Sequence, residues 1–538
     1  MKQPASITQA FYDSCERAPE KICLIFATQK VSYAELAQAA TRWAAGLRTW
    51  GLQPGARVAL FLENSPTFLA AYLGIHMAGG VVVLVNTQYR QVELRHILND
   101  AGVCLCITDP PRYPELQSVQ EALPDLMAVI TMTDWNVGTF KLWPDGTATP
   151  WEVSSFSPAP IQFPQADDLA IIAYTSGTTG RAKGAMLLHR NLAANSHAVT
   201  TAWRWTAADR LLLTLPLFHV HGLCVGIHGS WLTGSTVDLR RRFDPVDVYD
   251  TLLQGNVTMF FGVPTMYRRL ISEARRRTSM DQLVISSEQL ASGVLYPVRL
   301  FVSGSAPLDV QTFEEFEQLF GQPILERYGM TETLMNMTNP YEGERRPGTV
   351  GMPFPGQEAR IVDVQTRQPV PDGTAGEIQI RGPNVCKGYW QRPDATAEAF
   401  TPDGWFSTGD LGWRSADGYY TIAGRVRELI ISGGYNVYPR EIEEVLLTHP
   451  AVAEAAVLGL PDPDLGEQVV AVIVPTPRAS IDHPRLADEL VALCRVQLAA
   501  YKKPRQVFLV DSLPRNALGK VQKHLLKEQL CEVSSDNR

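Results

Sequence analysis

The sequence predicts an α/β protein with a large N-terminal domain of two helix-covered sheets, a small β-rich subdomain and an α+β C-terminal domain. The chain has 538 residues, more than one compact core usually holds. Before about residue 345, helical patterns alternate with short runs of β-branched residues, an order typical of parallel sheets covered by helices. Two later changes of pattern, near residue 345 and near Arg425, mark the other two parts.

The N-terminal part shows this alternation of helices and strands most clearly. Tyr33–Leu47 and Ser65–Met77 repeat apolar residues with a helical period, whereas Arg57–Phe61 is short and apolar, as a buried strand is. We expect a strand at Val81–Val85 for the same reason. Further along, strands are predicted at Leu211–Leu215, Met259–Val263 and Val298–Val302.

The rest of the chain divides into a β-rich region and an α+β region. Short strands such as Gly376–Gly382, separated by glycine and proline turns, predict the β-rich subdomain at about residues 345–425. We place the N-terminal domain at residues 1–425, a hinge near residues 425–428 and the C-terminal domain at residues 428–538. Within the C-terminal domain, helices are predicted at Pro439–Thr448 and Arg485–Leu498, and strands at Ala453–Leu458, Gln468–Pro475 and Gln506–Val510.

Composition and charge disfavour several classes of protein. A net charge of −8 argues against a general nucleic-acid binder. The eight cysteines include no C-x-x-C pair of a zinc or redox site, so we expect a reduced, cytoplasmic chain. Apolar runs fall short of the roughly 18 residues of a membrane span, and the first residues lack the apolar core of a signal peptide. The oligomeric state stays open.

The segment Tyr174–Gly184 carries the strongest sign of chemistry. Its eleven residues contain three glycines, four aliphatic hydroxyl side chains and one lysine. Glycines let successive backbone N–H groups form an anion-binding concavity, hydroxyls add neutral donors, and a lysine adds a positive charge. We therefore predict a polyphosphate-binding loop that consists of Thr175, Ser176, Gly177, Thr178, Thr179, Gly180 and Lys183.

Two other interpretations of this loop fit less well. A Walker A loop has Ser or Thr after its Gly-Lys pair, whereas Lys183 is followed by Gly184. Runs of Gly, Ser and Thr are commonly linkers. However, this run lies between the predicted strand Leu169–Tyr174 and Ala185–Leu192, which leads into a helical pattern. We therefore expect the loop at a strand-to-helix junction.

Five further motifs, taken in order, extend the pattern over most of the chain. They are Pro216–Gly222, Ser303–Leu308, Glu326–Glu332, Trp405–Asp410 with Gly424 and Arg425, and Pro514–Lys520. Together with the glycine loop they closely resemble the adenylate-forming superfamily of acyl-CoA synthetases, peptide-synthetase adenylation domains and firefly luciferase. The resemblance covers about residues 8–527.

The resemblance implies an ATP-dependent ligase that works in two steps. A carboxylate reacts with ATP to give an acyl-AMP and pyrophosphate, and coenzyme A then attacks the acyl-AMP to give an acyl-CoA and AMP. Activation is needed because a carboxylate is a poor electrophile at neutral pH. The implied partners are a small carboxylic acid, ATP, Mg²⁺ and coenzyme A.

The resemblance also assigns residues to the nucleotide. The glycine loop holds the β- and γ-phosphates, and Glu332 is a Mg²⁺ ligand, as suits a hard cation that prefers carboxylate oxygen. Tyr328 stacks on adenine. Asp410 accepts hydrogen bonds from the ribose hydroxyls with the help of Arg425. The other residues expected at ATP or AMP are Ser305, Ala306, Gly329 and Thr331.

Lys520 is expected, by the same resemblance, to reach the reacting carboxylate and the α-phosphate and to stabilise the charge that develops there. It lies far along the chain from Lys183, so the C-terminal domain is expected to be mobile and to close over the large domain. The family uses this domain in a second, rotated pose for thioester formation, with a hinge that matches Arg427, where Asp or Lys is common. The coenzyme A tunnel is expected at Ser432, Gly433, Gly434 and Tyr435.

Four segments look especially like malonyl-CoA synthetases, which bind the distal carboxylate of malonate with arginines. They are Pro216–Gly222, Phe261–Tyr267, Phe301–Ser305 and Glu326–Asn336. A second carboxylate in a dry site is costly unless a guanidinium meets it with paired hydrogen bonds. The matching arginines are Arg242 and Arg299, and the other residues expected at the acid are His219, Ser303, Gly304 and Met330.

Other acids and another acceptor remain open at this stage. Arginine at the Arg299 position also occurs in synthetases of plain fatty acids, and Asn436 stands where many malonate enzymes have lysine. A short- or medium-chain fatty acyl-CoA synthetase is the next interpretation, and an adenylation enzyme that loads a carrier protein differs only in its final acceptor. A non-catalytic nucleotide-binding scaffold is disfavoured, because the expected catalytic positions are all filled.

Overall fold

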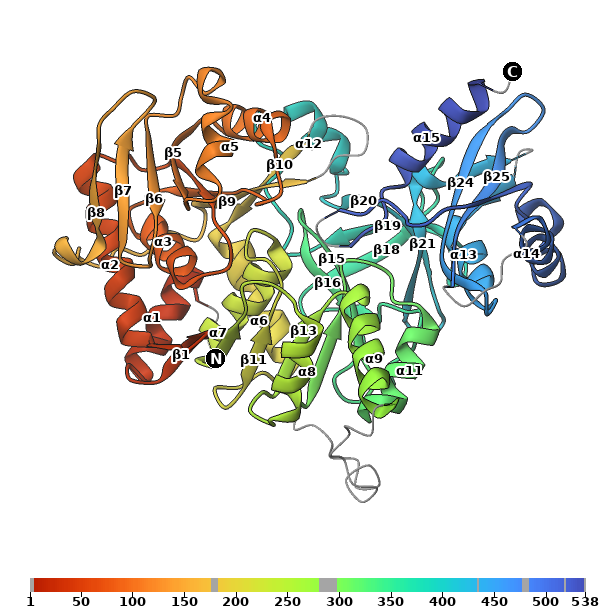
Figure 1. Ribbon diagram of the computed structural model, residues 1–538, viewed down its shortest axis with the longest axis horizontal. Coiled ribbons are helices and arrows are strands. Elements are labelled where there is room, and N and C mark those ends of the chain that lie inside the picture. The colour runs from red at the N-terminus through yellow and green to blue at the C-terminus, as the bar shows by residue number, and fades with distance from the viewer. Residues whose placement is uncertain are drawn as a thin grey trace. The chain divides into compact units, whose positions relative to one another are not determined.

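The computed structural model describes residues 4–175, 182–279, 298–432, 435–476, 483–516 and 519–536 (Figure 1). The chain divides into two compact units. The first unit consists of Met1–Pro347, Gly351–Glu358 and Ile380–Phe406. The second unit consists of Gly348–Val350, Ala359–Gln379 and Ser407–Arg538, so most of the β-rich region belongs to the same unit as the C-terminal region. The domain boundaries at 425–428 remain a prediction.

The first unit is built on two large sheets whose central strands are parallel. One sheet has, in spatial order, β10 (Lys183–Leu188), β9 (Leu169–Thr175), β4 (Val81–Leu84), β3 (Arg57–Phe61), β5 (Val103–Thr108), β6 (Ala128–Met132), β7 (Val137–Leu142) and β8 (Ala148–Glu152). The other has β17 (Met352–Pro353), β16 (Leu334–Thr338), β15 (Leu325–Met330), β14 (Leu300–Ser303), β13 (Met259–Gly262), β11 (Arg210–Leu213), β12 (Thr236–Leu239), β1 (Ile22–Phe26) and β2 (Gln29–Ser32).

Helices cover these sheets on both faces. On the β3–β5 sheet, one face packs against α4 (Gln91–Ala101) and α5 (Tyr113–Gln117). The opposite face shares one core with the second sheet and with α1 (Ile7–Arg17), α2 (Tyr33–Trp50), α3 (Pro66–Met77), α6 (His189–Ala202) and α7 (His228–Thr233). The other face of the second sheet packs against α8 (Pro245–Leu253), α9 (Pro264–Ser279) and α11 (Val310–Phe320), which lie side by side in Figure 1. Burial on both faces explains why the central strands are almost entirely apolar.

The second unit contains two smaller sheets. The β-rich region forms the order β18 (Glu358–Val362), β19 (Gly376–Arg381), β20 (Phe406–Arg414) and β21 (Tyr420–Arg425), and α12 (Pro393–Ala399) of the first unit lies between β19 and β20 in the chain. The C-terminal sheet has β23 (Tyr435–Val437), β22 (Ile430–Ser432), β25 (Gly466–Pro475) and β24 (Val452–Asp462), with β26 (Gln506–Leu509) beside β25. Helices α13 (Pro439–Leu447) and α14 (His483–Gln497) cover one face, and α15 (Lys523–Asp536) covers the other.

The predicted α/β fold class is confirmed, and one local prediction is wrong. Strand β3 has the predicted bounds, and the predicted helices and other strands are found with ends that differ by a few residues. The glycine loop, however, does not lead directly from a strand into a helix. It joins β9 to the antiparallel strand β10, and α6 starts only at His189. The apolar residues after Lys183 therefore belong to a strand. Within the described ranges, no helix is both long and apolar enough to cross a membrane.

Candidate active site

The two strand ends that flank the glycine loop in the chain are paired with each other. Thr175 at the end of β9 is opposite Lys183 at the start of β10 in the antiparallel register. The predicted phosphate-binding residues Ser176, Gly177, Thr178, Thr179 and Gly180 lie outside the described residues. The structure thus places the two ends of the loop, and both ends are half-buried.

Helix α4 fixes both ends of this loop from the side. The His96 ring Nε2 lies 2.8 Å from the carbonyl oxygen of Ala182. One turn later, the Asp100 carboxylate accepts a hydrogen bond of 2.7 Å from the Tyr174 hydroxyl. Residues four apart lie on the same face of a helix, so one helix face positions both sides of the loop. Neither residue could be identified from the sequence, because nothing in the chain order relates α4 to the loop.

Lys183 and Glu332 are connected through a residue that the sequence analysis also missed. The Lys183 ammonium lies over the ring of Tyr389, 5.3 Å from its centroid. The Tyr389 hydroxyl donates a hydrogen bond of 3.0 Å to Oε1 of Glu332. A lysine from β10 and a buried carboxylate that follows β15 therefore contact the same tyrosine.

Glu332 is suited to a magnesium ion that arrives with ATP. Its carboxylate is buried in the turn between β15 and β16. Among the described residues, no group of three or more His, Cys, Asp or Glu side chains could hold a metal ion alone. A Mg²⁺ ion bound to phosphates keeps several waters and needs only one or two protein carboxylates, so a single glutamate fits this use.

The carboxyl ends of the parallel strands of the second sheet bring several predicted residues together. Ser303 is the last residue of β14 and is fully buried. Ser305, two residues later, has a φ of 70°. A non-glycine residue in this left-handed region is strained by roughly 1 kcal/mol or more, and such residues are commonly found at functional sites. Ligands of α/β sheets bind at this edge.

Arg327 is the most unusual residue of this edge, and the sequence analysis did not select it. It lies on β15, is only 2% exposed, and packs against Gly304 so closely that a Cβ there would meet its Cζ at 2.5 Å. Its Nη2 donates a long hydrogen bond of 3.4 Å to Ser305 Oγ. Within the described part of the chain, its Nε has no hydrogen-bond partner and no carboxylate forms an ion pair with it.

Arg327 keeps its positive charge although it is buried. Burial lowers the pKa of Arg327 to about 9, with a smaller opposite effect of the neighbouring Glu326 carboxylate. The guanidinium is therefore still protonated at neutral pH. Adjacent residues on a strand point to opposite faces, so Glu326 does not meet the guanidinium directly. A buried cation without a partner is costly, and an anion that binds to it would recover that cost.

Two neutral histidines lie next to this guanidinium. Nδ1 of His221 is 3.2 Å from Ser305 Oγ, and the His221 backbone N–H donates to Nδ1 of His219 at 3.2 Å. Burial, and then the positive charge of Arg327, lowers the pKa of His219 to about 4 and that of His221 well below its ordinary value. Both rings are therefore uncharged at neutral pH, and Arg327 supplies the positive charge of this group.

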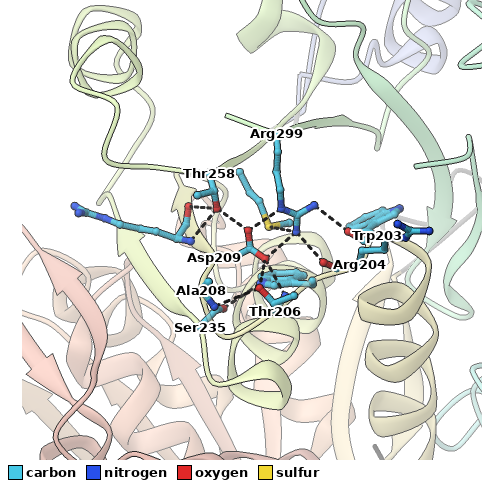
Figure 2. Close-up of polar contacts among 11 residues, drawn as sticks. Trp203, Arg204, Thr206, Ala208, Asp209, Ser235, Thr258 and Arg299 are labelled. Atoms are coloured by element: carbon cyan, nitrogen blue, oxygen red, sulfur yellow. Dashed lines mark hydrogen bonds and ion pairs between the residues drawn. The ribbon is translucent and has the colours of Figure 1, made fainter. Parts of the chain in front are cut away.

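Arg299, in contrast, is not at this edge of the sheet. It directly precedes β14, so it lies at the amino end of the strand whose carboxyl end is Ser303. Four residues of strand span roughly 13 Å. The Arg299 guanidinium forms two hydrogen bonds, of 2.7 and 2.8 Å, with the carboxylate of Asp209, as Figure 2 shows. It also donates to the backbone carbonyls of Trp203 and Arg204. The charge of Arg299 is therefore matched by an internal carboxylate, and its binding of the acid stays a prediction.

The remaining predicted residues of the first unit lie near the same carboxyl edge. Arg242 follows β12 and is exposed, whereas the preceding Arg240 is held by Asp238 and Asp247. Of the other six predicted residues, four lie in the β15–β16 hairpin and two lie in the turn after β14. These residues are Tyr328, Gly329, Met330 and Thr331 in the hairpin, and Gly304 and Ala306 in the turn.

The second unit brings its own predicted residues together. Asp410 on β20 and Arg425 on β21 form an ion pair of 2.7 Å. Burial, followed by the charge of Arg425, lowers the pKa of Lys520 to about 8. The carboxylates of Asp410 and Glu428 act in the opposite direction. Lys520, which is 110 residues from Asp410 in the chain, is thus close to it in the fold.

The residues predicted at the hinge and the coenzyme A tunnel are only partly described. Arg427 is exposed and lies in a short helical turn after β21. Ser432 is buried at the end of β22, and Tyr435 is 57% exposed at the start of β23, where its ring stacks on Tyr501 at 4.6 Å. Gly433 and Gly434 lie outside the described residues.

Comparisons with known proteins place these features in a family. The family model for AMP-binding enzymes matches residues 11–390, and the model for the C-terminal domain of the same enzymes matches residues 441–520. The chain is 36% identical over 504 residues to a malonate–CoA ligase of Arabidopsis thaliana, covering 89% of this chain and 79% of that protein. It is 33% identical over 555 residues to a long-chain-fatty-acid–CoA ligase of Bacillus subtilis, covering 98% and 94%.

A solved structure agrees with these matches over nearly the whole chain. The crystal structure of ATP-bound MatB from Rhodopseudomonas palustris has a TM-score of 0.86 and 39% identity, and 98% of each chain is covered. The large sheets, the β-rich region and the C-terminal α+β region are thus the parts of a known architecture. The chain belongs to the family of AMP-binding enzymes.

Proposed function

We propose that this enzyme is an AMP-forming acid–CoA ligase whose acid is malonate or a close small dicarboxylate. The reaction first converts the acid and ATP into an acyl-AMP and pyrophosphate, and then transfers the acyl group to coenzyme A with release of AMP. The family membership and the named relatives support the reaction class.

The observation that carries the choice of acid is the buried guanidinium of Arg327, which forms no ion pair with a carboxylate of the described residues. A monocarboxylate that reacts at its only carboxylate leaves this charge unmatched. A dicarboxylate has a second carboxylate that can accept paired, charge-assisted hydrogen bonds from a guanidinium. The malonate–CoA ligase relative agrees with this choice, and the fatty-acid relative does not.

Roles for the surrounding residues follow from this proposal. We assign the distal carboxylate to Arg327, and we assign to the acid site His219, Ser303, Gly304 and Met330 as expected from the sequence. Arg242 is retained as an additional charge at the same sheet edge, and we propose that Arg299 lies outside the acid site.

The nucleotide roles also remain proposals. Thr175, Lys183 and the loop between them hold the β- and γ-phosphates, and Glu332 holds Mg²⁺, which neutralises phosphate charge. Tyr328 and the residues of its hairpin and the Ser305–Ala306 turn contact the adenosine. In the second unit, Asp410 and Arg425 bind the ribose hydroxyls, and Lys520 stabilises charge in the adenylation transition state.

Two further expectations from the sequence are kept as proposals. The C-terminal domain, residues 428–538, serves adenylation and thioester formation in different poses about a hinge at Arg427, with coenzyme A at Ser432–Tyr435. We also infer a reducing, cytoplasmic location, because all eight cysteines are free thiols. Fractionation of the source cells tests the location.

The experiment that tests the function measures products for a panel of acids. The purified enzyme is incubated with ATP, Mg²⁺ and malonate, methylmalonate, succinate, propionate, butyrate or hexanoate, with and without coenzyme A. We expect pyrophosphate exchange with malonate in the absence of coenzyme A, and malonyl-CoA and AMP in its presence. A higher kcat/KM for hexanoate than for malonate would instead support a fatty acyl-CoA synthetase. Exchange without any acyl-CoA product would support transfer to a carrier protein.

A further inference from the structure

We propose that Tyr389 is a positioning residue that holds Lys183 and Glu332 ready for the Mg²⁺ complex of ATP. The proposal rests on the proposed function, because it takes Lys183 as the phosphate-binding lysine and Glu332 as the Mg²⁺ ligand. Neither the predicted site nor the family resemblance included Tyr389.

The Tyr389 side chain contacts both Lys183 and Glu332, each by a different kind of interaction. The Tyr389 ring lies 5.3 Å from the Lys183 ammonium, which is within the range of a cation–π attraction. The Tyr389 hydroxyl donates to the Glu332 carboxylate at 3.0 Å. The ring therefore acts on the cation and the hydroxyl acts on the anion.

Backbone hydrogen bonds fix the position of Tyr389 beside Lys183. The segment around it pairs with the outer edge of β10 through three hydrogen bonds of 2.8–2.9 Å. These are Met186 N–H to Gly388 O, Lys387 N–H to Met186 O, and Trp390 N–H to Gly184 O. The Tyr389 N–H donates to Thr396 Oγ1 at 2.9 Å. The strand that carries Lys183 thus pairs with the segment that carries Tyr389.

The same segment also fixes Glu332, which accepts the hydrogen bond from the Tyr389 hydroxyl. Cys386 donates its N–H to the backbone carbonyl of Glu332 at 2.8 Å. The backbone of Glu332 is therefore tied to the segment that presents Tyr389. A hydrogen bond to a carboxylate stabilises its ionised form, which is the form that a hard cation binds.

Because Tyr389 contacts both side chains, the Lys183 ammonium and the Glu332 carboxylate can each act on a different part of the Mg²⁺ complex of ATP. Within the described residues, Lys183 forms no ion pair with a carboxylate. An aromatic face attracts a lysine without neutralising its charge, so the ammonium remains able to bind phosphate. The Tyr389 hydroxyl, a neutral donor, orients the Glu332 carboxylate without neutralising its negative charge.

The test compares Tyr389→Phe, which keeps the ring and loses the hydroxyl, with Tyr389→Leu, which loses both. Calorimetric titration gives the affinity for ATP with Mg²⁺ and with a chelator present. For Tyr389→Phe, we expect the Mg²⁺-dependent gain in ATP affinity to fall roughly tenfold, as for loss of a hydrogen bond to a charged group. Its ATP affinity without Mg²⁺ should stay within about twofold of wild type. For Tyr389→Leu, affinity without Mg²⁺ should also fall about threefold or more, because the cation–π contact is lost.

A matched control separates this role from general damage to the fold. Tyr12→Phe removes a buried hydroxyl in the core, which donates to the carbonyl of Ala37 and contacts Sδ of Met77. It should leave the Mg²⁺-dependent gain unchanged. The concentration of Mg²⁺ that gives half-maximal pyrophosphate exchange should rise in Tyr389→Phe and stay constant in Tyr12→Phe. An unaltered Mg²⁺-dependent gain in a folded Tyr389→Phe enzyme would overturn the proposal. Absence of exchange with every acid in the wild type would instead overturn the proposed function.

Discussion

Arg327 and Arg299 are both arginines of the second sheet, but their surroundings differ. Arg299 has Asp209 and two backbone carbonyls around it, so its charge and its donors are used within the protein. Arg327 has one long hydrogen bond, to Ser305, among the described residues. We therefore expect Arg299 to contribute to stability and Arg327 to contribute to substrate choice.

Arg299→Ala is predicted to destabilise the fold and to leave acid selectivity unchanged. It leaves the Asp209 carboxylate, which is 4% exposed, without its cation, and losses of this kind cost roughly 2–4 kcal/mol. Denaturant unfolding measures the change, with Arg269→Ala, at an exposed arginine of α9, as the control. A tenfold change in the ratio of malonate to butyrate activity in a folded Arg299→Ala enzyme would refute this assignment.

The contribution of the Asp209–Arg299 pair is predicted to depend on pH. Burial acts to raise the pKa of Asp209, but hydrogen bonds from Arg299, Thr206 and Thr258 together outweigh it, so the pKa is lowered. A carboxyl with a lowered folded pKa stabilises the fold above its unfolded pKa of about 4, and this contribution is lost as the pH falls through the folded pKa. The difference in unfolding free energy between wild type and Arg299→Ala should therefore be full at pH 6 and shrink below about pH 4. A difference that stays constant down to pH 2 would contradict this.

Lys520 gives a second pH dependence, in the rate of adenylation. Its lowered pKa of about 8, caused first by burial, means that the ammonium loses its proton just above neutral pH. If the protonated form stabilises the transition state, pyrophosphate exchange should fall as the pH rises through about 8. In Lys520→Arg, the remaining exchange should not fall until a higher pH, because guanidinium has a much higher pKa. A wild-type profile that is flat to pH 10 would argue against this role.

The sequence alone could find the motif residues but not the role that we propose for Arg327. Arg327 stands inside a recognised motif, next to Tyr328, and nothing in the linear order says that its guanidinium is buried and forms no ion pair with the carboxylates that the structure describes. Conversely, Arg299 matched a motif position, but its partner Asp209 is 90 residues away in the chain. Pairing of distant charges is a property of the fold, so these two assignments needed coordinates.

At the scale of elements, the carboxyl edge of the second sheet determines which side chains meet. Parallel strands present their ends together, and here the ends of β14 and β15 bring the Ser303–Pro307 turn against Arg327. The amino ends of β11 and β14 bring Asp209 and Arg299 together at the opposite edge (Figure 2). One sheet thus separates a structural ion pair from a candidate binding site.

The turn after β14 provides a prediction at this scale. Gly304 leaves room for the Arg327 guanidinium, since a Cβ would approach its Cζ and Nε to 2.5 Å. Gly304→Ala should therefore displace the guanidinium and raise the KM for malonate about tenfold or more, with a much smaller effect on the KM for ATP. Steady-state kinetics with each substrate in turn measure both values. An equal rise in both KM values would show that the turn acts on the whole site rather than on the acid.

A helix or strand could be predicted where its own local sequence pattern is enough to determine it. Strand β3 is short, and four of its five residues are apolar; its predicted limits are confirmed. Strand β10 was not predicted, because Lys183–Leu188 is short and continuous in sequence with α6, and only pairing with β9 identifies it as a strand. Likewise, the pairing of residues 387–390 with β10 joins segments about 200 residues apart, which no local pattern can indicate.

At the scale of the whole molecule, the chain combines two units with different parts of the proposed chemistry. The first unit carries Lys183, Glu332 and Arg327, and the second carries Asp410 and Lys520. This division predicts that the two half-reactions can be separated by substitution. Lys520→Ala should lower pyrophosphate exchange by roughly 100-fold or more, while coenzyme A attack on supplied acyl-adenylate stays within a few fold of wild type. Equal loss of both steps would contradict the assignment of Lys520 to adenylation.

The most direct test of the central claim is the ratio of kcat/KM for malonate to kcat/KM for butyrate, which lacks the second carboxylate. We predict that wild type prefers malonate and that Arg327→Gln lowers this ratio roughly 100-fold, because the second carboxylate loses its cation. Arg327→Lys, which keeps the charge but not the paired donors, should give an intermediate ratio. A ratio in folded Arg327→Gln that stays within threefold of wild type would contradict the account.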